Sequence, residues 1–259
     1  FLADETMIII DPEEINRRIA GTIADYHFAP TRRARENLLR EGVPDASIFV
    51  TGNTVVDALH SVTQLIANDS DHSRDLATKF SFLDPRKRLL LVTGHRRENF
   101  GKGFENICQA LAELVRRHPD LDIVYPVHLN PNVQEPVNRV LGNLQTRVHL
   151  IPPLDYLPFV YLLGRCYLVL TDSGGVQEEA PSLGKPVLVM RETTERPEAV
   201  AAGTVKLVGT DRERIITEAS TLLQNQDAYT AMSFAHNPYG DGKAAKRIVD
   251  ILEQQLMAT

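Results

Sequence analysis

The stretch Tyr167-Leu168-Val169-Leu170-Thr171-Asp172-Ser173-Gly174-Gly175-Val176-Gln177-Glu178-Glu179 decides the fold class of this chain. Its apolar start predicts a buried strand, which leads through a turn with two glycines into a segment of helical pattern. Backbone N–H groups and the helix dipole favour an anion at such a helix start, and glycine lets a ligand approach closely. A carboxylate one turn further on can accept hydrogen bonds from a ribose diol. The stretch predicts a nucleotide site; the alternative is an ordinary turn with Ser173 as the helix N-cap.

Short apolar runs and amphipathic stretches of helical period alternate from Leu89 onward. Near-continuous Val, Leu and Ile strands separated by helices indicate a parallel sheet that is covered on both faces. We therefore predict an α/β chain with a doubly wound, Rossmann-like domain, whose ligands bind at the carboxyl ends of the strands. The predicted strands are 89–93, 122–127, 148–151, 167–170, 186–190 and 205–208, and the helices between them are 104–117, 132–141, 156–163, 176–183 and 196–201.

The first 52 residues follow a different pattern. They predict a helix over 12–24, a strand over 26–29, a helix over 31–41 and a strand over 48–51. Because two strands do not make a stable α/β domain, we expect residues 1–52 to be the end of a first Rossmann-like domain whose beginning is absent. Residues 53–240 are then the nucleotide-binding domain, and 241–259 a C-terminal helix.

Composition narrows the classes of partner and compartment. Hydrophobic residues make up 43% of the chain, enough for a core. The net charge of −6 argues against nucleic acid or an anionic membrane as the main partner. No apolar run approaches the roughly 20 residues that span a bilayer. Cys108 and Cys166 lack metal-ligand spacing and fit small core hydrophobes in a reducing cytoplasm. Asp4 and Glu5 stand where a signal peptide would be basic.

A second polar motif, Gly94-His95-Arg96-Arg97-Glu98-Asn99, also follows a predicted strand directly. Parallel strands end at the same edge, so we expect this loop to lie beside the glycine turn. His95 can transfer a proton near neutral pH, and the two arginines can neutralise a phosphate-bearing leaving group. The alternative is a solvated loop with a capping histidine.

Three further groups of polar residues are weaker signals. His128 lies in Pro126-Val127-His128-Leu129-Asn130-Pro131-Asn132 and is equally consistent with a structural histidine. The loop of residues 191–198 holds two arginines, which suit planar binding of phosphate or carboxylate, or a salt-bridged surface. Glu13 and Arg17 are four residues apart on a helix and are interpreted, from spacing alone, as a stabilising pair.

Taken together and in order, the motifs resemble the non-hydrolysing bacterial UDP-N-acetylglucosamine 2-epimerases. The resemblance runs from about Asp11 to the C-terminus. It rests on residues 94–99, 126–131, 171–186, 191–198 and on Asn237-Pro238-Tyr239-Gly240-Asp241-Gly242. It implies the GT-B architecture, with two Rossmann-like domains and the nucleotide-sugar in the cleft between them.

The resemblance also implies a reaction. Members interconvert UDP-N-acetylglucosamine and UDP-N-acetylmannosamine by abstracting the C2 proton, expelling UDP to give a glycal, and adding UDP back. No nicotinamide or metal is implied, which agrees with the lack of a G-x-G-x-x-G fingerprint. A homodimer is implied, because family members are commonly dimers.

Roles carry over by motif position. His95 matches the essential histidine near the departing phosphate. Glu13 and Arg17 match an active-site carboxylate and arginine, which replaces their structural interpretation. The remaining matches are Ser173, Gly174 and Gly175 for the diphosphate, Glu179 for the ribose, Arg196 for the substrate, Phe159 for the uracil pocket, and His128 for a regulatory substrate site.

The chain departs from the family at its start. The Gly-Thr-Arg-Pro-Glu loop is absent, as are the catalytic aspartate and glutamate of the first domain, so we expect this chain alone to bind UDP but to epimerise poorly. Three alternatives stay open: a GT-B glycosyltransferase that uses a UDP-sugar, a non-catalytic UDP-sugar-binding module, and a hydrolysing epimerase.

Overall fold

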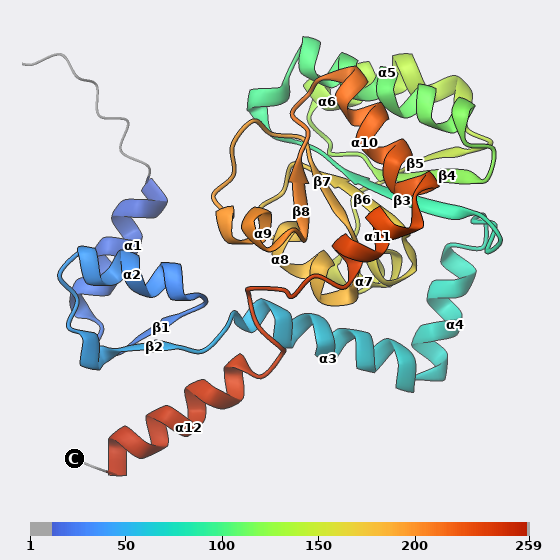
Figure 1. Cartoon of the computed structure of the whole chain (residues 1–259). Helices are drawn as coiled ribbons and strands as arrows, with labels where there is room; N and C mark the ends of the chain where they lie inside the picture. The colour runs from blue at the N-terminus through green and yellow to red at the C-terminus, as the bar shows by residue number, and fades with distance from the viewer. Residues whose placement is uncertain (1–11, 258–259) are drawn as a thin grey trace, which may run out of the picture.

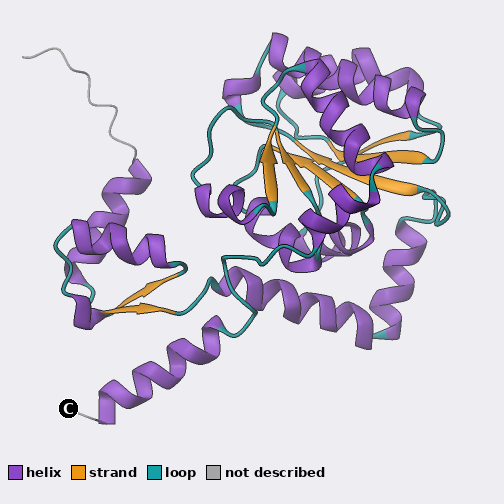
Figure 2. Ribbon diagram, viewed as in Figure 1, coloured by secondary structure: helices purple, strands orange, loops and turns teal. Residues whose placement is uncertain are grey.

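Six parallel strands form the central sheet of the protein, as the computed structural model shows for residues 12–257 (Figures 1 and 2). The sheet order is β5-β4-β3-β6-β7-β8. Chain order thus reverses between β3 and β6, which is the switch point of a doubly wound sheet. The predicted α/β class is confirmed. The strands are β3 (Arg88–Thr93), β4 (Leu121–Pro126), β5 (Val148–Ile151), β6 (Leu168–Thr171), β7 (Val187–Val189) and β8 (Val205–Leu207).

Helices cover both faces of this sheet, so its strands are apolar on both sides (Figure 2). Alternate residues of β3 show the division, because Leu90 and Val92 belong to one core cluster and Leu89 and Leu91 to the other. The first cluster includes α5 (Lys102–Arg117), α6 (Pro131–Leu141) and α10 (Arg212–Gln224). The second includes α3 (Thr54–Asn68), α4 (Ser70–Lys79), α7 (Tyr156–Arg165), α8 (Val176–Glu179) and α9 (Pro197–Ala202).

A small unit precedes the six-stranded sheet and lies apart from it on the left in Figure 1. It consists of α1 (Pro12–Ile23), β1 (His27–Ala29), α2 (Arg32–Arg40) and β2 (Ile48–Val50). The strands β1 and β2 pair in parallel with each other in a sheet of their own. The predicted elements are all present in this unit. The domain boundary at residue 52 stays a prediction, and residues 1–11 lie outside the described part of the chain.

Polar contacts from the C-terminal part of the chain connect the two units. Asn53, at the start of α3, donates its backbone N–H to the Tyr239 carbonyl at 2.7 Å. Arg247 of α12 (Ala244–Met257) donates to the Thr51 carbonyl at 3.1 Å. After α11 (Gln226–Ser233), the chain therefore returns past the linker, and α12 runs toward the small unit (Figure 1).

The predicted helix over 176–183 is wrong in its second half. The α-helix α8 ends at Glu179, and a 3₁₀ turn (Ala180–Leu183) follows. Pro181 explains the change, because it has no N–H to donate to the carbonyl one turn earlier. The capping alternative for Ser173 also fails, since Gly175 occupies the N-cap position and no side chain caps the helix.

No helix within residues 12–257 has both the length and the apolar character needed to cross a bilayer.

Candidate functional site

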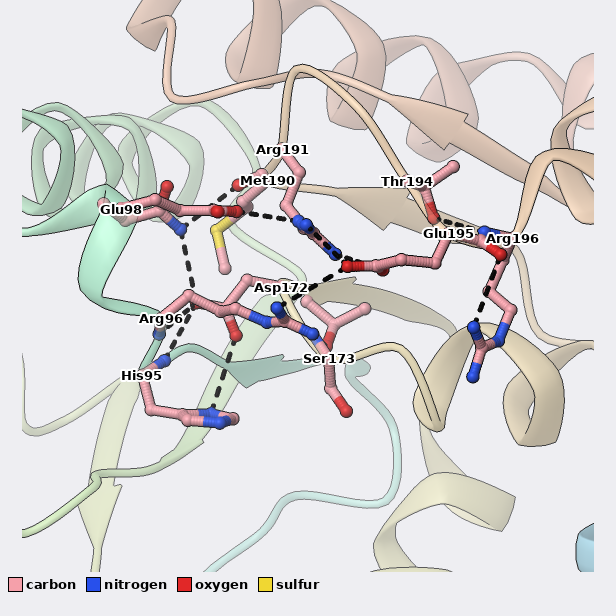
Figure 3. Close-up of polar contacts among 12 residues, drawn as sticks. His95, Arg96, Glu98, Asp172, Ser173, Met190, Arg191, Thr194, Glu195 and Arg196 are labelled. Carbon is pink, nitrogen blue, oxygen red and sulfur yellow. Dashed lines mark hydrogen bonds and ion pairs between the residues drawn. The ribbon is translucent and has the colours of Figure 1, made fainter. Parts of the chain in front are cut away.

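The carboxyl ends of β3 and β6 bring the two strongest sequence motifs together at the switch point. Thr93 and Thr171 are partners in the ladder, and their hydroxyl oxygens are 2.6 Å apart. Each strand then ends, and its loop leaves at the same edge of the sheet. The loop of His95 and the turn of Ser173 therefore face each other, as predicted (Figure 3).

Asp172 joins these two loops from a fully buried position. Its Oδ2 atom accepts the backbone N–H groups of His95 and Arg96, both at 2.9 Å, and the Asn99 amide at 3.2 Å. Its side chain is 0% exposed. No separate role was predicted for Asp172 from the sequence, although a carboxylate directly after an apolar strand is a signal that could have indicated one.

The imidazole of His95 lies close to this carboxylate and stacks on a second histidine. The His95 Nδ1 atom is 3.6 Å from Asp172 Oδ1, and the His95 side chain is 48% exposed. The ring of His128 stacks on that of His95, with centroids 5.4 Å apart and planes 19° apart. His128 also accepts the Asn130 N–H on Nδ1 at 3.1 Å. The two histidine motifs therefore meet, while the regulatory role of His128 stays a prediction.

Within residues 12–257, the glycine turn has backbone N–H donors without a hydrogen-bond acceptor. Ser173 donates its N–H to the Thr171 hydroxyl at 3.0 Å. In the described residues, the N–H groups of Gly174 and Gly175 have no protein acceptor. A Cβ placed on Gly174 would lie 3.9 Å from the Arg196 Nη2 atom, so the guanidinium adjoins the turn. Free N–H groups beside a guanidinium at a strand-to-helix turn are suited to an anion such as phosphate.

Arg196 is held by a buried carboxylate on α8. Its Nε donates to Glu178 Oε1, and Glu178 Oε2 accepts the Asn53 amide at 2.5 Å. Burial raises the pKa of Glu178, although the Arg196 charge and hydrogen bond act in the opposite direction. Because Asn53 begins α3 just after the linker, the contact connects the candidate anion site to the border between the two units. Sequence reasoning missed both Glu178 and Asn53.

The residues expected to bind a nucleoside also lie close together. Tyr156 of α7 donates its hydroxyl to Glu179 Oε1 at 2.7 Å, and burial raises the pKa of Glu179. Phe159 is three residues further along the same helix and packs, partly buried, against the second core cluster. An aromatic side chain and a carboxylate acceptor are thus placed beyond the glycine turn, although their binding roles stay predictions.

Arg191 forms ion pairs within the protein, which is one of the two alternatives that the sequence left open for the loop of residues 191–198. It is 7% exposed and donates to Glu98 at 2.7 Å and, through two nitrogens, to Glu195 at 2.6 and 3.0 Å. These hydrogen bonds lower the pKa of Glu195 to about 2. The bidentate pair holds the loop after β7 together, and the hydrogen bond from Arg191 to Glu98 joins this loop to the His95 loop (Figure 3).

The structure does not bring Arg17 to this edge of the sheet. Arg17 donates to Glu14 at 2.7 Å and to Glu41 at 2.6 Å, both within the small unit. The expected pairing of Arg17 with Glu13 stays a prediction. The Glu13 side chain lies outside the described part of the structure.

A cavity of about 420 Å³ lies between the two units and adjoins the candidate site. Thr31, Arg33 and Asn37 line it from the small unit, and Glu178 and Arg196 line it from the large one. Across it, Thr31 donates its hydroxyl to Glu198 at 2.8 Å. Among residues 12–257, no three His, Cys, Asp or Glu side chains are grouped to hold a metal ion.

A doubly wound sheet with free turn amides at its switch point defines an α/β protein with a phosphate-binding edge. A family model described as UDP-N-acetylglucosamine 2-epimerase matches residues 10–253. The chain belongs to this family, and the GT-B class implied by the resemblance is supported by its structural neighbours.

Individual relatives agree with the family. The UDP-N-acetylglucosamine 2-epimerase of Escherichia coli K12 is 60% identical over 242 residues, which are 93% of this chain and 64% of that protein. The solved epimerase of Neisseria meningitidis, bound to UDP-GlcNAc, has a TM-score of 0.87 at 47% identity, covering 94% of this chain and 65% of the other. That of Methanocaldococcus jannaschii, in complex with UDP-GlcNAc and UDP, has a TM-score of 0.74 at 35% identity, covering 94% and 65%. The chain spans about 64% of the length of the curated relatives it matches.

Proposed function

We propose that this chain forms the nucleotide-binding part of a UDP-N-acetylglucosamine 2-epimerase, which interconverts UDP-N-acetylglucosamine and UDP-N-acetylmannosamine. One observation carries the proposal beyond the family name. The histidine loop after β3 and the glycine turn after β6 meet at the switch point, and Asp172 connects them. A proton carrier is thus adjacent to donors suited to a departing diphosphate.

The proposed binding follows from the groups at this edge. The N–H groups of Gly174 and Gly175, the Ser173 hydroxyl and the Arg196 guanidinium receive the diphosphate. Glu179 accepts hydrogen bonds from the ribose hydroxyls, and Phe159 lies at the uracil. Each contact also stabilises free UDP, which keeps the leaving group in place for the return step.

The proposed reaction is an elimination of UDP followed by its re-addition, with the opposite configuration at C2. A carboxylate removes the C2 proton, the bond from C1 to the diphosphate oxygen breaks, and 2-acetamidoglucal and UDP result. His95 stabilises the negative charge that develops on the departing diphosphate. Protonation of C2 from the opposite face and re-addition of UDP give the epimer. By the family resemblance, Glu13 and Arg17 contribute a carboxylate and an arginine to this chemistry.

Proton NMR in deuterated water, with the purified chain and UDP-N-acetylglucosamine, tests the proposal. The manno epimer with deuterium at C2 would establish the reaction in this chain. UDP resonances that shift or broaden without exchange would instead identify a binding module. The absence of both signals would contradict the proposal. Transfer of label to an acceptor sugar would favour a glycosyltransferase.

The binding-module outcome has a structural observation in its favour. Arg17, an expected member of the catalytic set, forms its hydrogen bonds inside the small unit. We therefore expect this chain alone to bind UDP and to epimerise slowly at most. Robust turnover by the purified chain would overturn that expectation.

We further propose a homodimer in the cytoplasm. The dimer follows the family resemblance, and sedimentation velocity of the purified protein tests it. The compartment rests on two free, buried cysteines, Cys108 and Cys166, which fit a reducing environment. Fractionation of the source cells, with antibody detection, tests the compartment.

A further inference from the structure

One oxygen of the buried Asp172 carboxylate takes part in none of the hydrogen bonds described above. Oδ2 has three donors, but Oδ1 is buried without any hydrogen-bond partner. A buried acceptor without a donor loses its hydrogen bond to water and gains none in return, so native structures seldom keep one. Such an oxygen at the edge of a binding site indicates a donor that is close by and engages it.

The imidazole of His95 is placed to be that donor. Its Nδ1 atom lies 3.6 Å from Asp172 Oδ1, which is slightly beyond hydrogen-bond distance. The backbone of His95 is fixed by Oδ2 of the same carboxylate at 2.9 Å, so a small rotation of the ring suffices to close the gap. Figure 3 shows the ring and the carboxylate facing each other across this distance.

We propose that Asp172 is a positioning residue for His95, holding the proton of the neutral imidazole on Nδ1 and leaving Nε2 available to the ligand. An ionised carboxylate can only accept hydrogen bonds, so it selects the tautomer that donates from Nδ1. When the ring is protonated, Nδ1–H donates to Asp172 and Nε2–H donates to an anionic oxygen of the ligand. This inference deepens the proposed role of His95 and rests on it.

The stacked neighbour provides an internal contrast. His128 accepts the Asn130 N–H on its Nδ1 atom at 3.1 Å, so its neutral form carries the proton on Nε2. The two rings in contact are therefore expected to be opposite tautomers. This arrangement differs from that of a loop histidine in water, where no carboxylate selects the proton position.

The position of Asp172 beside the glycine turn also links its contact with His95 to ligand binding. Asp172 immediately precedes Ser173 and the glycine turn, while its carboxylate holds the His95 and Arg96 backbone. A ligand that orders the turn therefore acts on the histidine through one residue. Diphosphate binding and histidine orientation are coupled in this way.

Long-range nitrogen–proton NMR of the ¹⁵N-labelled full chain, without ligand and with its imidazoles neutral, tests the proposal. The His95→Gln and His128→Gln variants assign the two ring systems by loss of signal. In the unsubstituted chain, we expect His95 to show the Nδ1–H pattern and His128 the Nε2–H pattern. Sequential backbone-to-ring resonance assignment of the unsubstituted chain identifies the same rings without a variant, so an Nε2–H pattern for His95 would overturn the proposal even if no variant folds.

Asp172→Asn supplies the second arm. Its amide N–H₂ would face His95 Nδ1 and force the proton to Nε2, so the ratio of Nδ1–H to Nε2–H should fall about tenfold, the scale of one hydrogen bond. An unchanged ratio would contradict the proposal. Asn99→Ala removes another contact of Asp172 while keeping the carboxylate, and should leave the ratio unchanged.

Two features keep this experiment separate from the proposed function. The signal of His118, which contacts Ser220 at 2.9 Å elsewhere in the fold, reports whether each variant is folded. The tautomers are measured without UDP and without turnover, so they do not depend on epimerase activity. If His95 has the expected tautomer but UDP does not bind, the proposed function fails and the positioning role stands.

Discussion

The small unit and the six-stranded unit are made from the same kinds of element, yet they are held together differently. In the large unit, both faces of the sheet are buried under helices. In the small unit, Ala29 and Ile48 are the buried apolar residues within its strands. The isoleucines of α1 are exposed, with Ile15 at 39%, Ile19 at 57% and Ile23 at 78%.

The difference shows that a strand-and-helix pattern is not enough to give a unit its own stability. Burial of apolar area is the main favourable term in folding, and two strands with two helices offer little of it. The small unit is instead attached to the large one by polar contacts, among them Thr31 with Glu198 and Arg247 with Thr51. Three substitution experiments test this contrast.

Matched truncations in the two units should give the largest difference. Phe104 is 0% exposed in the first core cluster, so Phe104→Ala should lower the free energy of unfolding by about 3–5 kcal/mol. Ile19 is 57% exposed, so Ile19→Ala should change it by less than about 0.5 kcal/mol. Urea unfolding followed by circular dichroism measures both. A loss at Ile19 as large as that at Phe104 would mean that the α1 face is covered in solution.

A second pair of variants compares the anion-binding capacity of the two units. Arg196→Ala should weaken UDP binding about tenfold or more, because a charge-assisted hydrogen bond to phosphate contributes about 1.5–3 kcal/mol. Arg35→Ala removes an arginine that pairs with Asp45 in the small unit, and should leave UDP affinity unchanged. Isothermal titration calorimetry with UDP measures both. Equal losses would show that attraction to net charge, rather than the glycine turn, determines binding.

The smallest effect is expected from removing one ion pair, and it should depend on pH. Arg191 lowers the pKa of Glu195 to about 2 from a usual 4.5, so the pair stabilises the fold above pH 4.5 and loses that contribution as pH falls toward 2. Glu195 is 52% exposed, so Glu195→Gln should lower the free energy of unfolding at pH 7 by under about 1 kcal/mol. The difference in the free energy of unfolding between Glu195→Gln and the unsubstituted chain should be smaller at pH 3, because the contribution of the pair is lost as pH falls toward 2.

Glu14→Gln is the matched variant in the small unit. Arg17 hydrogen bonds also lower the pKa of Glu14 to about 2, but this carboxylate is solvated and its partner arginine is 43% exposed. We expect no measurable change in the free energy of unfolding at either pH. A clear loss for Glu14→Gln, with none for Glu195→Gln, would reverse the contrast between the units.

Local signals in the sequence predicted most of the secondary structure. Short apolar runs such as 89–93 and 148–151 became β3 and β5, and the amphipathic stretch over 104–117 became most of α5. The principal error, in the helix over 176–183, came from passing over Pro181, whose missing N–H changes the last turn to 3₁₀. The expected meeting of the His95 loop and the glycine turn also followed from the sequence, because parallel strands end at the same edge of a sheet.

The site was less predictable wherever a role depends on contacts between distant segments. Arg17 donates to Glu41, which is 24 residues away and belongs to another element, and only the fold shows this partner. Glu178 and Glu179 are neighbours in sequence, yet one holds Arg196 and the other accepts the Tyr156 hydroxyl. These partners are 18 and 23 residues away, so spacing along a helix could not identify them.

The sequence by itself determined the parallel sheet, the edge at which ligands bind and the residue types available there, because these depend on local periodicity and on glycine and proline positions. Only the tertiary structure decided which polar groups are satisfied and which are free. Asp172 shows the reason: its burial and its contacts with residues 73 to 77 positions away arise from the pairing of β3 with β6. Whether a carboxylate is solvated or buried beside a histidine depends on such long-range packing, which no local pattern records.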